Sequence, residues 1–227
     1  MITLGSCANY DEAEETCEFI LSKSFCDRDL EMKITMHECR ILVFKGDNIA
    51  CVSRGIGALT SMAELNIPPI LDNPEISPPY EIELWKEVLD ACREHGFVKT
   101  FEALPSLNDN FLLAVHSLLV ELAAPLAWCA PHLLQTIPLV GIVLTLKYGI
   151  CVQTAFHVPL FTAFFDCQLG VLAFGLSNPD RCNSDSVITR GAIEISKSVL
   201  ENFGASNLLS CRTWGVFGTY YVESLQS

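Results

Sequence analysis

A stretch of 25 residues without a formal charge, LAAPLAWCAPHLLQTIPLVGIVLTL at residues 122–146, limits what this chain can fold into. It is long enough to cross a lipid bilayer as a helix, and it is apolar enough to form the centre of a protein core. Pro125, Pro131 and Pro138 divide the stretch into short pieces, and no cluster of Lys or Arg flanks it. Both features favour a buried core, so we expect no membrane association.

The charge of the chain is concentrated in its first half. Residues 1–110 hold 20 of the 27 acidic side chains and 9 of the 14 basic ones, a net charge of −11, which leaves −2 for residues 111–227. A direct nucleic-acid surface needs clustered Lys and Arg, so this charge argues against one. No linker separates the acidic N-terminal half from the apolar C-terminal half, and we expect a single domain over residues 1–227.

Hydrophobic periodicity predicts several helices in this domain. Acidic residues at the start of an amphipathic pattern, or a glycine at its end, mark the helix boundaries. The expected helices lie at residues 10–24, 81–97, 111–128 and 186–204, and Gly96 and Gly204 act as stops. In the helix at 81–97 the spacing places Ile82, Trp85, Leu89 and Cys92 on one apolar face. Five prolines in residues 67–79 predict an irregular connection between the first two.

Runs rich in β-branched and aromatic residues predict antiparallel β-hairpins packed against these helices. The first hairpin pairs residues 31–44 with 48–56 across a break at Lys45–Asp47. Two more hairpins pair residues 139–146 with 150–158 and residues 160–167 with 171–177. The fold class expected from the sequence is therefore α+β.

The cysteine content indicates a reducing compartment. The chain has eleven cysteines, an odd number that cannot be fully paired within one molecule. Its N-terminus, MITLGSCANYDEAEETCEF, has neither a basic segment nor an unbroken apolar run of the kind found in secretory leaders. We expect a cytosolic or nuclear protein with free thiols.

Two Cys-x-x-His pairs are candidate zinc ligands. Cys92 and His95 lie in CREH, and Cys129 and His132 lie in CAPH. Thiolate and imidazole are the ligands of structural zinc, and a three-residue step on a helix turns both side chains to one face. Zinc is therefore a possible cofactor, held by these four residues, and no other cofactor is expected.

The other cysteines and histidines give weaker signals. His37 and Cys39 are competing candidates for any vacant ligand position. The alternative to a metal site is that the cysteines are buried thiols, which pack as small apolar side chains, and that the histidines are ordinary ones. His116 and His157 lie in apolar stretches, and we interpret them as core histidines. The sequence contains no Gly-rich phosphate loop, nucleophile elbow or HExxH motif, so no enzymatic activity is expected.

Five stretches resemble the adenovirus early region 4 thirty-four-kilodalton protein family, in the same order along the chain. The first four are KITMHEC, PPYEIELWKEVLDACREH, LVGIVLTLKYGICVQTAF and FTAFFDCQLGVLAFGLS. The last, residues 188–226, is similar to the family's long C-terminal helix followed by Ser-Cys-Arg-Thr, here Ser210 to Thr213. The family's basic C-terminal helix is replaced here by one of mixed charge.

The resemblance implies a viral early adaptor that acts in the host nucleus and cytoplasm. Family members act with a larger early viral protein and recruit host elongin B, elongin C, a cullin and a RING protein to degrade host antiviral and DNA-damage-response proteins. The family's elongin-docking box matches VLDAC, with Val88, Leu89 and Cys92 as its anchors. The alternative function is an interaction module, zinc-stabilised or plain, that recruits no ligase.

Overall fold

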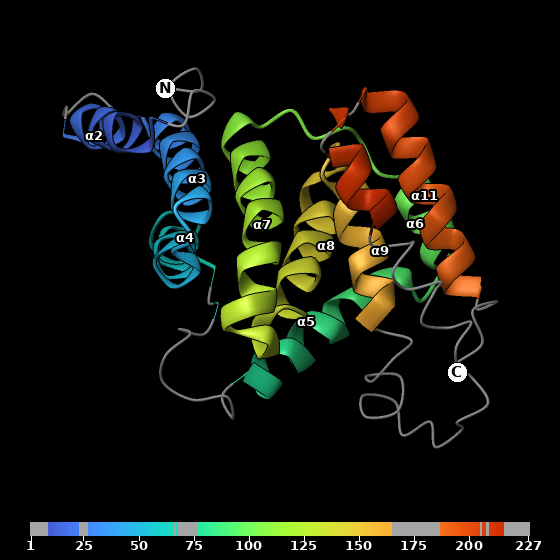
Figure 1. Ribbon diagram of the computed structural model, residues 1–227. Helices are drawn as coiled ribbons and strands as arrows, with labels where there is room; N and C mark the ends of the chain where they lie inside the picture. The colour runs from blue at the N-terminus through green and yellow to red at the C-terminus, as the bar shows by residue number, and fades with distance from the viewer. Residues whose placement is uncertain are drawn as a thin grey trace. The chain divides into compact units, whose positions relative to one another are not determined.

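The computed structural model describes residues 9–22, 27–65, 67, 77–164, 187–204, 206–207 and 209–215. These residues are about 81 % helical and form no β-strand (Figure 1). Ser106 and Ile150 form an isolated parallel β-bridge, which belongs to no sheet among the described residues. The expected α+β fold with antiparallel hairpins is therefore wrong, and the described part of the chain is all-α.

The chain forms two compact units, and each is built from two separate segments. Unit 1 comprises Met1–Tyr80 and Asn108–Ile137, and unit 2 comprises Glu81–Leu107 and Pro138–Ser227. The single domain expected from the sequence stays a prediction. The acidic and apolar halves do not correspond to these units, because each unit takes residues from both sides of residue 110.

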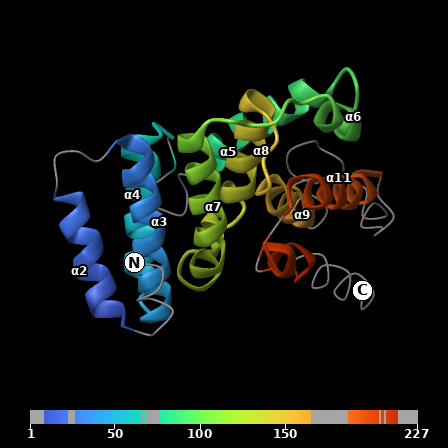
Figure 2. The same ribbon diagram turned by 90° about the horizontal axis from the view of Figure 1, so that it is seen from above.

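Unit 1 is a group of helices packed on one another. Its helices are α2 (Tyr10–Leu21), α3 (Arg28–Phe44), α4 (Asn48–Met62), α7 (Asn110–Cys129) and the short 3-10 helix η1 (Pro131–Leu133). Helices α3, α4 and α7 contact one another pairwise, and α2 packs against α3 (Figure 2).

Side-chain contacts fix the directions of the helices in unit 1. The Arg28 guanidinium lies 4.1 Å from the centre of the Phe111 ring, which places the start of α3 beside the start of α7. The Cys129 thiol lies 3.8 Å from the Asn48 carbonyl oxygen, which places the end of α7 beside the start of α4. Helix α3 therefore runs parallel to α7, and α4 runs antiparallel to it.

The first predicted hairpin is a helix–turn–helix. The Asp27 carboxylate accepts a hydrogen bond from the Leu30 amide at 2.8 Å, and the Asp47 carboxylate accepts one from the Ala50 amide at 3.0 Å. These two N-caps start α3 and α4. Gly46, at φ +81°, makes the turn between them. Ile34, Thr35 and Ile41 of α3 and Val52 and Ile56 of α4 are buried in the core, and this tertiary packing outweighs their β propensity.

The second predicted hairpin is also helical. Helix α8 (Thr136–Tyr148) covers the first predicted strand, and helix α9 (Thr154–Phe164) takes residues 154–158 of the second, whose residues 150–153 form the turn between the two helices. An apolar run of this kind does not distinguish a buried strand from a buried helix, because its apolar residues follow neither the 3.6-residue period of a helix nor the two-residue period of a strand. Residues 160–164 of the third hairpin belong to α9, and its remaining residues, 165–177, lie outside the described residues.

Unit 2 contains five further labelled helices and the helical residues 209–215. The labelled helices are α5 (Ser77–Cys92, in this unit from Glu81), α6 (Phe97–Glu102), α8 from Pro138, α9, and α11 (Val187–Phe203). Helix α11 packs on both α9 and α6 (Figure 1). The predicted helices at residues 10–24, 81–97, 111–128 and 186–204 are confirmed as α2, α5, α7 and α11. Gly96 and Gly204 both have the left-handed backbone expected of helix stops.

The turn between α8 and α9 is tied to the segment that follows α6. The Leu107 amide donates to the Ile150 carbonyl at 2.8 Å, and the Ile150 amide donates to the Pro105 carbonyl at 2.8 Å. Gly149 has φ +117°, and a Cβ atom there would lie 2.4 Å from the Pro105 oxygen. Only glycine fits this position, because both the backbone angle and the space exclude a side chain.

Two glycines in α4 have opposite surroundings, and we expect opposite effects from their replacement by alanine. A Cβ atom on Gly55 would lie 2.5 Å from Leu122 Cδ2, whereas no atom lies within 4 Å of one on Gly57. Gly55→Ala should lower the free energy of unfolding by about 1–2 kcal/mol through overpacking. Gly57→Ala should raise it by about 0.5–1 kcal/mol through helix propensity. Urea unfolding of both variants measures the difference, and equal effects would contradict the packing of α4 on α7.

Candidate docking surfaces

The box predicted to dock elongin lies on α5 and is only partly accessible. Val88 is buried, with 2 % of its surface exposed, whereas Leu89 and Cys92 are half-buried. Leu89 and Cys92 are three residues apart, so they are neighbours on one side of the helix. Two of the three predicted anchors therefore reach the surface, and Val88 supports the helix from inside.

The buried face of α5 differs from the one that the sequence predicts. The prediction placed Ile82 on the apolar face together with Trp85, but the Ile82 side chain is 47 % exposed. Leu84, Trp85 and Val88 are the buried apolar residues, and the Trp85 ring packs at 4.7 Å between centroids against Phe161 of α9. The helix is thus rotated from the predicted orientation, and this rotation turns Leu89 outward.

The Cys92 thiol is in its neutral form at neutral pH. Burial raises the pKa of this thiol, and a hydrogen bond with the Thr100 side chain opposes the shift. The Cys92 carbonyl accepts a hydrogen bond from the Gly96 amide at 2.9 Å, which closes the end of α5. A zinc ligand must be a thiolate, whereas an apolar anchor must stay protonated. The surroundings of Cys92 fit an anchor better than a metal ligand.

The four predicted zinc ligands are divided between the two units. Cys92 and His95 belong to unit 2, and Cys129 and His132 belong to unit 1. The Cys129 thiol lies 3.1 Å from the Pro125 carbonyl of its own helix, and burial raises the pKa of this thiol as well. Within the described ranges, no three His, Cys, Asp or Glu side chains are grouped so that they could hold a metal ion. Zinc binding stays a prediction.

The competing residues His37 and Cys39 lie on α3. Cys39 is fully buried, and its thiol donates to the Cys51 carbonyl of α4 at 3.5 Å. Burial, and then the positive charge of Arg40, lower the pKa of His37. The other two histidines of the sequence prediction, His116 and His157, are fully buried, which confirms that they are core histidines.

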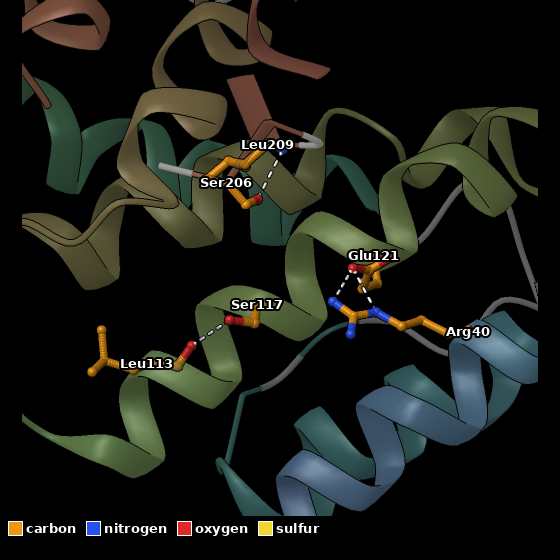
Figure 3. A network of polar contacts seen from close by, with 6 residues as sticks. All are labelled: Arg40, Leu113, Ser117, Glu121, Ser206 and Leu209. Atoms are coloured by element: carbon orange, nitrogen blue, oxygen red, sulfur yellow. Dashed lines mark hydrogen bonds and ion pairs between the residues drawn. The ribbon is translucent and has the colours of Figure 1, made fainter. Parts of the chain in front are cut away.

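An ion pair inside unit 1 was not predicted. Both Arg40 Nε and Arg40 Nη2 donate to Glu121 Oε1, at 2.9 and 2.6 Å (Figure 3). The Glu121 side chain is 9 % exposed, and one turn before it on α7 Ser117 donates to the Leu113 carbonyl at 2.9 Å. Glu121 is the only acidic residue in the sequence between residues 111 and 165. Because a lone charge in an apolar helix needs a partner, this isolated acidic residue was the sequence signal for a buried ion pair.

Three large apolar side chains are exposed at one end of unit 1. They are Phe44 at the end of α3, Ile49 at the start of α4 and Trp128 at the end of α7, with 67 %, 62 % and 81 % of their surfaces exposed. We call these three residues the Trp128 patch. The sequence did not reveal the patch, because Trp128 stands in an apolar stretch in which burial is the natural expectation.

Helix α7 is the one described helix that is long and apolar enough to cross a membrane. This is weak evidence for a span, because 61 % of its most apolar window is buried, as in a core helix. The uncharged stretch at residues 122–146 is not one helix. It is divided among the end of α7, η1 and α8, with breaks near the two prolines Pro131 and Pro138.

Comparisons with protein-family models, with curated proteins and with solved structures found no match for this chain. The described residues define an all-α class of fold, and two of their surfaces with accessible apolar side chains are relevant to binding. These surfaces are the Leu89–Cys92 face of α5 and the Trp128 patch.

Proposed function

We propose that the protein is a binding adaptor without an active site of its own, which docks host elongin B and C and through them a cullin-RING ubiquitin ligase. The observation that carries this proposal is the position of Leu89 and the neutral Cys92 thiol, side by side on the accessible side of α5. In this role it acts with a larger early viral protein, in the host nucleus and cytoplasm, against host antiviral or DNA-damage-response proteins.

Recognition of a helix by a groove supports this mode of docking. Such recognition needs only a few apolar anchors on one side of a helix. Leu89 supplies an aliphatic side chain, and Cys92 supplies a small one that remains uncharged when it is transferred out of water. Val88 takes no part in the contact, so the box works with two anchors and with α5 held in place by its buried residues.

The docking proposal predicts that two substitutions on α5 abolish binding and leave the fold intact. Leu89→Ser combined with Cys92→Ser should reduce the recovery of elongin B and C at least about tenfold, because both anchors lose their apolar contact. Pull-down from transfected cells followed by mass spectrometry measures this. The matched control is Glu83→Ser with Lys86→Ser, two exposed positions on the same helix, and it should retain binding.

Two further variants separate docking from stability and from zinc. Val88→Ser should lower the melting temperature, because the Val88 side chain is buried. His132→Ala should change neither folding nor elongin recovery. Absence of elongins from the wild-type pull-down would refute ligase recruitment. Stoichiometric zinc that is lost in the His132→Ala protein would favour the alternative, an interaction module stabilised by zinc.

A further inference from the structure

The Trp128 patch is formed by residues that are distant in sequence. The Cys129 thiol lies 3.8 Å from the Asn48 carbonyl oxygen. Trp128, which precedes Cys129, and Ile49, which follows Asn48, therefore lie at the same end of unit 1. Phe44 reaches this end because the turn at Gly46 joins α3 to α4. The Tyr10 ring stacks on Phe44, with ring centres 5.7 Å apart, and extends the apolar surface toward α2.

Carboxylates lie beside the part of this surface formed by Tyr10, Phe44 and Ile49. Asp11, Glu12 and Glu14 follow Tyr10 on α2, and Asp47 lies between Phe44 and Ile49. Lys45 Nζ lies 2.9 Å from Asp11 Oδ1 and 2.6 Å from Glu14 Oε2. The four acidic residues and this one lysine give a net charge of −3 beside three exposed apolar side chains.

We infer that the Trp128 patch binds a basic amphipathic segment of a partner protein, with apolar side chains on one face and Lys or Arg beside them. Trp128 and Ile49 receive the apolar side chains, and the carboxylates beside Phe44 and Ile49 attract the basic ones. A second copy of this chain would bring two ends of charge −3 together, so self-association is disfavoured. The same charge repels nucleic acid and anionic lipid. The patch lies in unit 1, away from the Leu89–Cys92 face in sequence, and does not depend on the elongin proposal.

The test uses the full-length protein labelled with 5-fluorotryptophan and two designed peptides. One peptide is an 18-residue helix with leucines on one face and lysines on the other, and in the second peptide glutamates replace the lysines. Fluorine NMR should show three tryptophan resonances, of which Trp128→Phe assigns one. The basic peptide should shift the Trp128 resonance, leaving those of Trp85 and Trp214 in unit 2 as internal references. The acidic peptide should shift none of them.

Variants then test the two parts of the surface. Trp128→Ala should weaken binding of the basic peptide about tenfold or more, and thermal unfolding should show an unchanged fold, because this side chain is 81 % exposed. Asp11→Asn with Glu12→Gln should weaken binding about fivefold. Glu15→Gln with Glu18→Gln removes the same charge further along α2 and should have a smaller effect.

Three results would overturn the inference. Equal shifts from the two peptides would mean that the patch adheres to any apolar surface. A shift of the Trp128 resonance by phosphatidylserine vesicles, without one from the basic peptide, would indicate a membrane surface. A dimer in sedimentation that Trp128→Ala dissociates would show that a second copy covers the patch.

Discussion

Acidification from pH 6.5 to pH 4 is expected to lower the free energy of unfolding by about 3 kcal/mol through His116 alone. Burial lowers the pKa of His116 from its ordinary value of 6.5 to about 4 in the folded protein. Between these two values the unfolded chain binds the proton and the folded chain does not. The stability that His116 contributes is therefore complete above pH 6.5 and is lost as the pH falls to about 4.

Urea unfolding at a series of pH values measures this effect. In His116→Leu, where no imidazole remains to titrate, the decline of stability between pH 6.5 and pH 4 should be less steep by about 3 kcal/mol. His95→Leu is the matched control, because the His95 side chain is 62 % exposed, and it should keep the steep decline of the wild type. If the wild type and His116→Leu lose stability in parallel, His116 is not buried as an uncharged group.

Arg40→Met is expected to lower the free energy of unfolding by about 3 kcal/mol at pH 7, because it leaves the Glu121 carboxylate buried without its ion-pair partner. The two charge-assisted hydrogen bonds from Arg40, at 2.9 and 2.6 Å, are lost together. The double variant Arg40→Met with Glu121→Met should recover most of this stability, because a buried ion pair replaced by apolar side chains is often neutral.

The double-mutant cycle distinguishes this effect from a simple loss of packing. Arg54→Met is the matched control, since Arg54 of α4 pairs with Glu38 of α3 at 2.8 Å and both side chains are more exposed than those of Arg40 and Glu121. It should cost no more than about 1 kcal/mol. Additive effects of the two single variants would contradict a coupled buried pair.

The helices with a clear polar side were predictable from the sequence, and those without one were not. Helix α2 opens with Asp11 and Glu12, and α11 ends at Gly204, so both boundary signals were present. Helices α8 and α9 are apolar on nearly every side, and no local pattern separates such a helix from a strand. For α3 and α4 the prediction followed the β-branched residues, whereas in the structure both helices begin at the N-caps Asp27 and Asp47.

The candidate sites show the same division between local and distant information. Spacing alone placed Leu89 and Cys92 on one side of a helix, and this holds in the structure. The burial of Val88 depends on contacts outside α5, and local spacing contains no such information. Arg40 and Glu121 are separated by 81 positions, so only the packing of α3 on α7 reveals the pair.

The alternation of segments between the two units sets the order in which the protein can form on the ribosome. Helices α2, α3 and α4 are synthesised first, but α7, whose Leu122 packs directly on Gly55, follows only after the first segment of unit 2. Unit 1 therefore cannot complete its core until residues 108–137 have been synthesised, and until then the side chains of α3 and α4 that pack on α7 stay uncovered. During that interval the uncovered apolar side chains make the nascent chain prone to aggregation. No single truncation separates the units, because a fragment that ends before α7 lacks part of unit 1.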